Sequence, residues 1–339
     1  MSTIYVALDD GLLVVQGGNG RWEATPRMDE TAPRCLAADP AYPERVWCGT
    51  AGGGAWRSDN AGVSWRTAGD ALPAVDVSAL AVSPGEEVVY AGIDPSAMWR
   101  SDDGGRHWEE LPAMNRLPSA PTWSFPPRPD TSHVRWITLD PAAPDRLYVC
   151  IEAGALVRST DGGRTWTDRV PDGPADTHTL AAHPDSPGRL YSAAGDGFGM
   201  PGRGYNESHD GGDTWARPDE GIERHYLFGL AVDPGDPETV VVSAADSPMT
   251  AHNPQVADST VYRRSGGGPW HEVREGLPEP KGSLRALLAA NAEEPGVFYA
   301  ASNRGLYRSA DAGASWEPVL APLPDRYRGQ SPNAIAVTE

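Results

Sequence analysis

The stretch RSTDGGRTW, Arg158 to Trp166, decides the fold because versions of it recur along the chain. Other copies, some of them worn, also end in tryptophan, and the final residues of the set are Trp22, Trp65, Trp108, Trp166, Trp215, Trp270 and Trp316. These tryptophans lie roughly 40 to 60 residues apart, and a period near that length is typical of solenoids, propellers and other repeat arrays. The repeat therefore sets the architecture.

The segments around each tryptophan have the composition of short β-strands. One unit contains RCLAADP, RVWCGT, GAWRSD and SWRTA at residues 34–40, 45–50, 54–59 and 64–68. Such runs are rich in Val, Leu, Tyr, Trp and Thr and are separated by Asp-Pro, Gly and Asn turns, which predicts four antiparallel strands per unit. An apolar stripe of helical period and length does not occur in the sequence, so the predicted class is all-β.

The repeated phrase falls between the third and fourth predicted strands of each unit. A glycine such as Gly163 tolerates the positive φ of a tight hairpin, and Asp161 can accept hydrogen bonds from turn amides. Ser159 can do the same, while Trp166 can pack its ring under the turn. We interpret the phrase as a folding device rather than a catalytic motif.

The pattern S-x-D-x-G-x-x-W resembles the Asp-box, or BNR, repeat of WD40/YVTN/BNR-like propellers. Sialidases, sortilin-type receptors, some xyloglucan hydrolases and a photosystem II assembly factor carry it. The aspartate position is filled by Asp103, Asp161, Asp210 and Asp311, with Asn60 replacing it once. The resemblance covers essentially the whole chain and implies a β-propeller whose boxes lie on its periphery, away from the ligand site.

Seven tryptophan-bearing hairpins predict seven four-stranded blades in one domain, residues 1–339. The first unit supplies three strands, and NAIAVTE at residues 333–339 matches the missing leading strand. Blade 1 is therefore predicted to combine residues 2–26 with 332–339, which closes the ring and removes free sheet edges. Sialidases have six blades, so this count argues against transferring their activity.

The net charge, the apolar runs and the cysteines limit the classes of function that the protein can have. The formal net charge of −19 disfavours nucleic-acid and anionic-membrane partners. The sequence lacks a signal-like start and a long apolar run, and the odd set Cys35, Cys48 and Cys150 indicates buried free thiols. We expect a cytoplasmic protein without a cofactor.

Aligning the predicted innermost strands places one set of residues at the channel mouth, where propellers usually bind ligands. The equivalent positions are Arg34, Ser78, Arg135, His178, Phe228, Arg285 and Asn333. Guanidinium groups recognise carboxylate or phosphate bidentately, so three arginines suggest an anion site. The alternative is that they pair with acids and only stabilise the mouth.

Glu152 is the candidate catalytic acid among the acids expected at the mouth, which are Asp94, Glu152, Asp196 and Asp246. It follows an apolar strand, where partial burial can raise its pKa into the range of a general acid. A salt bridge with Arg135 is the competing interpretation.

Histidines and long loops add further candidates near the mouth. His133, His178 and His225 are candidate ligand-binding residues at the mouth. Together with His252 they can alternatively converge on a metal or serve as hydrogen-bonded structural residues. The second interpretation is favoured, and no metal ligand is assigned. Insertions at 114–133 and 246–260, with a shorter one at 195–208, predict a wall or lid in which Trp123, Phe125 and Tyr226 stack on a flat ligand. A proline-stiffened cover over the channel is equally compatible.

These features predict a cytoplasmic ligand-binding propeller that recognises an anionic or sugar-like small molecule. One alternative is a glycoside hydrolase, sialidase-like or with two carboxylates, or a lyase at the same mouth. Arg34, Arg135, Arg285, Tyr226 and Glu152 supply the residue types of a sialidase site, but without its flanking motifs. A protein-interaction scaffold is the other alternative.

Overall fold

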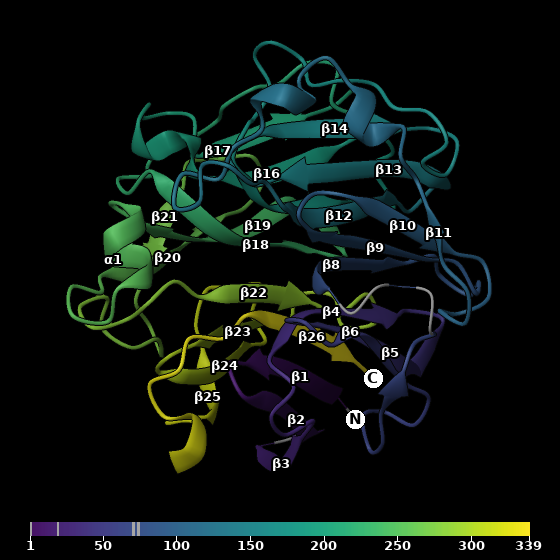
Figure 1. Cartoon of the computed structure of the whole chain (residues 1–339). Coiled ribbons are helices and arrows are strands. Elements are labelled where there is room, and N and C mark those ends of the chain that lie inside the picture. Colours follow the sequence, from purple (N-terminus) through teal and green to yellow (C-terminus); the bar gives the residue numbers. More distant parts are fainter. Residues whose placement is uncertain (1, 19, 70–71, 73–74) are drawn as a thin grey trace.

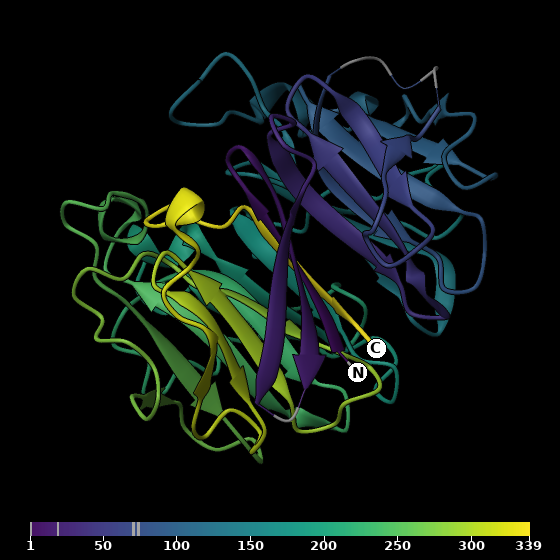
Figure 2. The same cartoon turned by 90° about the horizontal axis from the view of Figure 1, so that it is seen from below.

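A computed structural model describes residues 2–339 except 19, 70–71 and 73–74. Within that part of the chain the strands form seven antiparallel sheets, arranged in order around a ring (Figures 1 and 2). The innermost strands β4, β8, β12, β15, β18, β22 and β26 contact one another in sequence, and β26 returns to β4. The predicted seven-bladed, all-β propeller is confirmed.

Blade 1 closes the ring as predicted from the two end segments. Its sheet consists of β26 (Ala334–Thr338), β1 (Ser2–Leu8), β2 (Gly11–Gly18) and β3 (Arg21–Arg27). The register pairs Thr3 with Thr338 and Ala7 with Ala334, and both ends of the chain lie side by side in Figures 1 and 2.

The next sheets follow the chain outward from the channel. Blade 2 has β4 (Pro33–Asp39), β5 (Tyr42–Thr50), β6 (Gly54–Ser58) and β7 (Arg66–Thr67). Blade 3 has β8 (Asp76–Val82), β9 (Val89–Asp94), β10 (Met98–Ser101) and β11 (Glu109–Glu110). Blade 6 has β18 (Tyr226–Asp233), β19 (Asp236–Ala245), β20 (Ser259–Arg264) and β21 (His271–Val273). Blade 7 has β22 (Leu287–Ala290), β23 (Phe298–Ser302), β24 (Gly305–Ser309) and β25 (Glu317–Leu320).

Blades 4 and 5 have three regular strands and a single bridge where a fourth strand is predicted. They contain β12 (Val134–Asp140), β13 (Ala143–Ile151) and β14 (Ala155–Ser159), then β15 (Thr177–Ala182), β16 (Leu190–Ala194) and β17 (Tyr205–Ser208). The bridges join Arg158 to Thr167 and Glu207 to Ala216. Pro218 lacks the N–H that a longer ladder in blade 5 would need.

Short helices occupy the connections. They are η1 (Met114–Arg116), η2 (Ala120–Thr122), η3 (Gly195–Phe198), α1 (Pro248–His252) and η4 (Asp325–Tyr327). In the described residues, no helix is both long enough and apolar enough to span a bilayer. Cys35, Cys48 and Cys150 are buried free thiols, as predicted.

The repeated turn has the predicted internal bonding. In blade 4, Ser159 Oγ accepts the N–H of Gly163 at 2.9 Å and donates to Asp161 Oδ1, which also accepts the N–H of Thr165 at 2.8 Å. Gly163 has φ +86°, and a Cβ placed on it would lie 3.4 Å from Trp166 Cζ2. The tryptophan ring therefore lies against the turn, which confirms its structural role.

Arginines just before these turns connect neighbouring blades, a contact that the sequence did not indicate. Arg57 Nη1 donates to the carbonyl of Gly104 at 3.0 Å, and Arg158 Nη1 donates to that of Gly211 at 2.9 Å. Arg57 is also paired with Asp59 and Glu87. Each pair of neighbouring blades in the described residues also shares a hydrophobic cluster, so the core lies between blades.

Candidate ligand site at the channel mouth

The innermost strands carry β-bulges at the ring positions inferred from sequence. The register shifts between Pro33 and Cys35 and between Val134 and Trp136, and comparable shifts flank Ser78, His178 and Phe228. Arg285 and Asn333 precede the regular parts of β22 and β26. A bulge inserts an extra residue and re-aims its side chain, so each of these five bulged strands can turn one residue toward the mouth.

These residues meet around a cavity of about 430 Å³, which we call the mouth cavity. Its lining includes Arg34, Arg135, Glu152, Phe228, Arg285 and Asn333. Asp76, Asp94, Phe125, Arg128, His133 and His252 contribute further polar and aromatic groups. The volume lies within the usual range for small-molecule sites.

Two of the three arginines sit against one aromatic ring. The guanidinium carbons of Arg135 and Arg285 lie 4.9 Å and 4.4 Å from the ring centroid of Phe228. Arg285 donates to neutral groups, the Ser331 hydroxyl and the Pro332 carbonyl. Burial, reinforced by the positive charge of Arg135, lowers the pKa of Arg285 to about 10. An anion in this cavity would relieve that repulsion.

Glu152 lies at the mouth, but its pKa is shifted in the opposite direction to the one expected from the sequence. Its Oε2 is 2.8 Å from His133 Nε2 and 3.5 Å from Arg135 Nε, so the alternative salt bridge with Arg135 is present. Burial acts to raise its pKa, but the hydrogen bond from His133 and the charge of Arg135 together lower the pKa to about 2. The expectation of a raised pKa is wrong, because desolvation is outweighed.

His178 and Tyr226 belong to a buried polar cluster beside the cavity. The Nδ1 of His178 lies 2.7 Å from the Leu227 carbonyl, and its ring stacks on Phe228 at 4.6 Å. The Tyr226 hydroxyl lies 3.4 Å from His178 Nε2 and 3.1 Å from His252 Nε2. Burial raises the pKa of Tyr226 well above its usual value, so this hydroxyl does not suit a phenolate nucleophile.

Trp123 and His225 occupy less accessible positions than the ligand-contacting ones expected for them. Trp123 is 8% exposed in the core cluster between blades 3 and 4, and its indole N–H donates to Ser119 Oγ at 2.9 Å. Phe125, from the same insertion, lines the mouth cavity and packs edge-on against His133. His225 is half-buried, with its carbonyl packed close to Gly197 and Gly204.

Asp176 lies beside Glu152 and His178, next to the mouth cavity, and sequence reasoning missed it. Its Oδ1 accepts the N–H of Ala153 at 2.8 Å and lies 3.7 Å from His178 Nε2. Within the described chain, ligand atoms of Glu152, Asp176 and His178 lie within 4.8 Å of one another, which is compatible with a metal ion. The guanidinium of Arg135 beside Glu152 opposes a cation there. The signal in the sequence was its position: Asp176 stands two residues before His178, just before the strand Thr177–Ala182 begins.

This geometry defines a seven-bladed β-propeller, and comparison with known proteins supports that fold class. Glycoside hydrolases are among the similar proteins. No family model matches the chain. A xyloglucanase from a Paenibacillus species is 28% identical over 297 residues, covering 73% of this chain and 27% of the xyloglucanase.

Solved structures agree on the architecture. The GH74 enzyme from Niastella koreensis superposes with a TM-score of 0.67 at 18% identity, covering 93% of this chain and 52% of that enzyme. YCF48 bound to a D1 peptide gives a TM-score of 0.59 at 15% identity, covering 91% of this chain and 92% of YCF48. The chain thus spans about half the length of the GH74 enzyme, and these likenesses establish the fold alone.

Proposed function

We propose that this propeller binds an acidic sugar, or a closely related carboxylate, in the mouth cavity. The observation that carries the proposal is the convergence of Arg34, Arg135 and Arg285 on one cavity in a protein of net charge −19. Planar guanidinium groups suit bidentate contacts with a carboxylate. We also propose that the protein is cytoplasmic and that its repeated turns are Asp-boxes.

The surrounding groups favour a polar ligand with a flat face. Asn333 and His252 line the cavity and offer hydrogen-bonding groups for hydroxyls, while Phe125 and Phe228 offer aromatic surfaces. Two of the lining acids already have cationic partners, since Asp94 Oδ2 lies 2.5 Å from Arg128 Nη2 and Glu152 Oε2 lies 3.5 Å from Arg135 Nε. The likeness to a xyloglucanase directs the choice among anions toward saccharides.

Calorimetric titration with galacturonate and with galactose tests the proposal, because the two sugars differ by the carboxylate. Galacturonate is expected to bind and, at 100 times its dissociation constant, to stabilise the fold by about 2.7 kcal/mol. Arg135→Gln should weaken binding by about 10-fold or more, since charge-assisted hydrogen bonds contribute about 1.5–3 kcal/mol.

The matched control is Arg274→Gln, whose side chain is 56% exposed and pairs with Glu272 on the outer strand β21. It should bind galacturonate like the wild type. Equal binding of galactose and galacturonate, or no carboxylate binding at all, would overturn the proposal. Binding of acidic peptides alone would redirect it toward a protein-interaction scaffold.

Glycoside hydrolysis is the second candidate function, favoured by the sequence likeness to a xyloglucanase. The low pKa of Glu152 suits a base or nucleophile rather than the general acid expected from sequence. Glycosidases need a second carboxyl group about 5 to 10 Å away, and Asp76 and Asp94 line the same cavity. Reducing-end release from xyloglucan should then be lost in Glu152→Gln, whereas ligand binding without turnover leaves only the binding proposal.

A further inference from the structure

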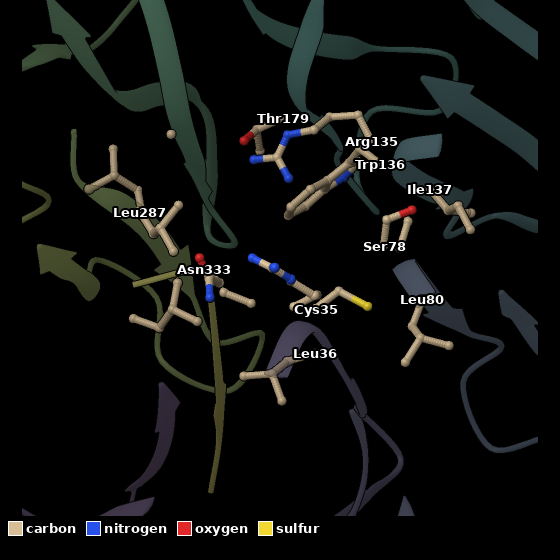
Figure 3. Close-up of a pocket in the computed structure, with 16 residues that line it drawn as sticks. Cys35, Leu36, Ser78, Leu80, Arg135, Trp136, Ile137, Thr179, Leu287 and Asn333 are labelled. Atoms are coloured by element: carbon tan, nitrogen blue, oxygen red, sulfur yellow. The ribbon is translucent and has the colours of Figure 1, made fainter. Parts of the chain in front are cut away.

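A second, smaller cavity continues the channel directly beneath the mouth. This inner cavity has a volume of about 60 Å³ and shares Arg34, Ser78, Arg135 and Asn333 with the mouth cavity. Figure 3 shows Arg135 and Asn333 on the same cavity as Leu36, Leu80 and Leu287. The two cavities therefore meet at the guanidinium groups.

The inner cavity is largely aliphatic. At five of the seven ring positions, the residue two places further along the chain is aliphatic and lines this cavity; these residues are Leu36, Leu80, Ile137, Leu287 and Ile335. A cationic layer thus lies directly above an aliphatic layer, and this order is already written in the sequence as Arg-x-Leu, Ser-x-Leu, Arg-x-Ile, Arg-x-Leu and Asn-x-Ile.

Polar groups in the inner wall already have protein partners. Ser78 Oγ donates to the Val134 carbonyl at 2.7 Å, and Thr179 Oγ1 donates to the Phe228 carbonyl at 2.8 Å. The indole N–H of Trp136 donates to the Leu180 carbonyl at 2.9 Å. An enclosed water needs two to four polar partners, so the lower part of this cavity suits an apolar group better than water.

We infer that the natural ligand is amphiphilic, with a carboxylate at the arginines and a short alkyl or acyl group inserted into the inner cavity. This inference rests on the proposed anion site and narrows its ligand class. A 150 Å³ cavity holds the six carbons of benzene, so 60 Å³ accommodates about two or three carbons beyond the carboxylate. An acylated acidic sugar satisfies both layers, as does a simple short-chain carboxylate.

Titration with straight-chain carboxylates from acetate to octanoate isolates the alkyl contribution. Each methylene buried in the inner cavity should tighten binding about fourfold, up to about four carbons, with no further gain beyond. Neutral alcohols of the same chain lengths should bind far more weakly, because they lack the contact with the arginines. Alcohols that bind as tightly as the carboxylates would overturn the inference.

Two variants change the size of the inner cavity in opposite directions. Leu80→Phe should reduce the dependence on chain length, and Leu287→Ala should extend the gain to longer chains. If Leu80→Phe fails to fold, Leu287→Ala still decides the matter. Carboxylates that bind equally at every length, with no change in Leu287→Ala, overturn this inference alone. No binding by any carboxylate, galacturonate included, overturns the proposed function as well.

Discussion

Arginines at the outer turns and arginines at the mouth have contrasting surroundings. Arg57 donates to the Gly104 carbonyl of the next blade and pairs with Asp59, and Arg158 repeats this pattern with Gly211. At the mouth, Arg135 and Arg285 face the same phenyl ring and repel each other. The outer arginines connect neighbouring blades through paired contacts, whereas Arg285 is buried beside a second positive charge and its nearest hydrogen-bond partners are neutral.

Aromatic residues should show the largest difference between the two regions. Trp108 is 7% exposed, and its indole N–H donates to the carbonyls of Ala68 and Gly105. Trp108→Ala should lower the free energy of unfolding by about 3–5 kcal/mol. Phe125 at the mouth is only half-buried, so Phe125→Ala should lower the free energy of unfolding by less than about 1 kcal/mol. Guanidinium denaturation measures both, and equal losses would remove the distinction.

Removing one arginine from each region should change stability in opposite directions. Arg57→Ala leaves the buried Gly104 carbonyl without its donor and removes one of the two arginine partners of Glu87, so it should lower the free energy of unfolding by about 2 kcal/mol. Arg285→Met removes a buried, repelled charge and should raise it by about 1 kcal/mol. Thermal melts of the two variants with the wild type provide the measurement. A loss in Arg285→Met comparable to that in Arg57→Ala contradicts the comparison.

The smallest effect concerns acid sensitivity of the outer turns. Hydrogen bonds from the hydroxyl and amide of Thr214 lower the pKa of Asp210 to about 2. A carboxyl group with a lowered folded-state pKa stabilises above its unfolded pKa near 3.9, and this stabilisation is lost as pH falls toward 2. Because Asp210 is exposed, the change should stay below about 1 kcal/mol.

Asp210→Asn provides the matched variant, since Asn60 fills the same place in blade 2 and accepts the N–H of Ser64 at 2.9 Å. Denaturation curves at pH 5 and pH 2.5 should show a smaller loss of stability for this variant than for the wild type. An identical loss would place the acid sensitivity elsewhere.

The fold was largely readable from sequence because every blade repeats the same local rules. The spacing of tryptophans gave the blade number, and the match of residues 333–339 to other leading strands gave ring closure. Strand alignment also placed Arg34, Arg135 and Arg285 together, because equivalent positions in a ring face one channel. The contacts of Arg57 and Arg158 could not be predicted, because each arginine contacts a turn of the next blade and the sequence of one repeat carries no information on that neighbour.

Side-chain electrostatics and loop packing were less accessible. Glu152 lies where it was expected, but the sign of its pKa shift depends on the distances to His133 and Arg135. Trp123 could not be separated from Phe125 by sequence, because the turns η1 and η2 decide which ring enters the core. The closeness of Asp176 to Glu152 could not be predicted, because the two residues belong to neighbouring blades and Asp176 precedes the bulge at His178.

Ring closure by β26 has a consequence for the order of synthesis. A nascent chain that has reached residue 330 already contains Arg34, Arg135 and Arg285, but β1 still lacks its inner neighbour. Arg285 also lacks Ser331 and Pro332, its hydrogen-bonding partners. Because an unpaired inner strand is an edge open to wrong partners, the ring and the contacts of Arg285 are complete only after residues 331–338 have been made.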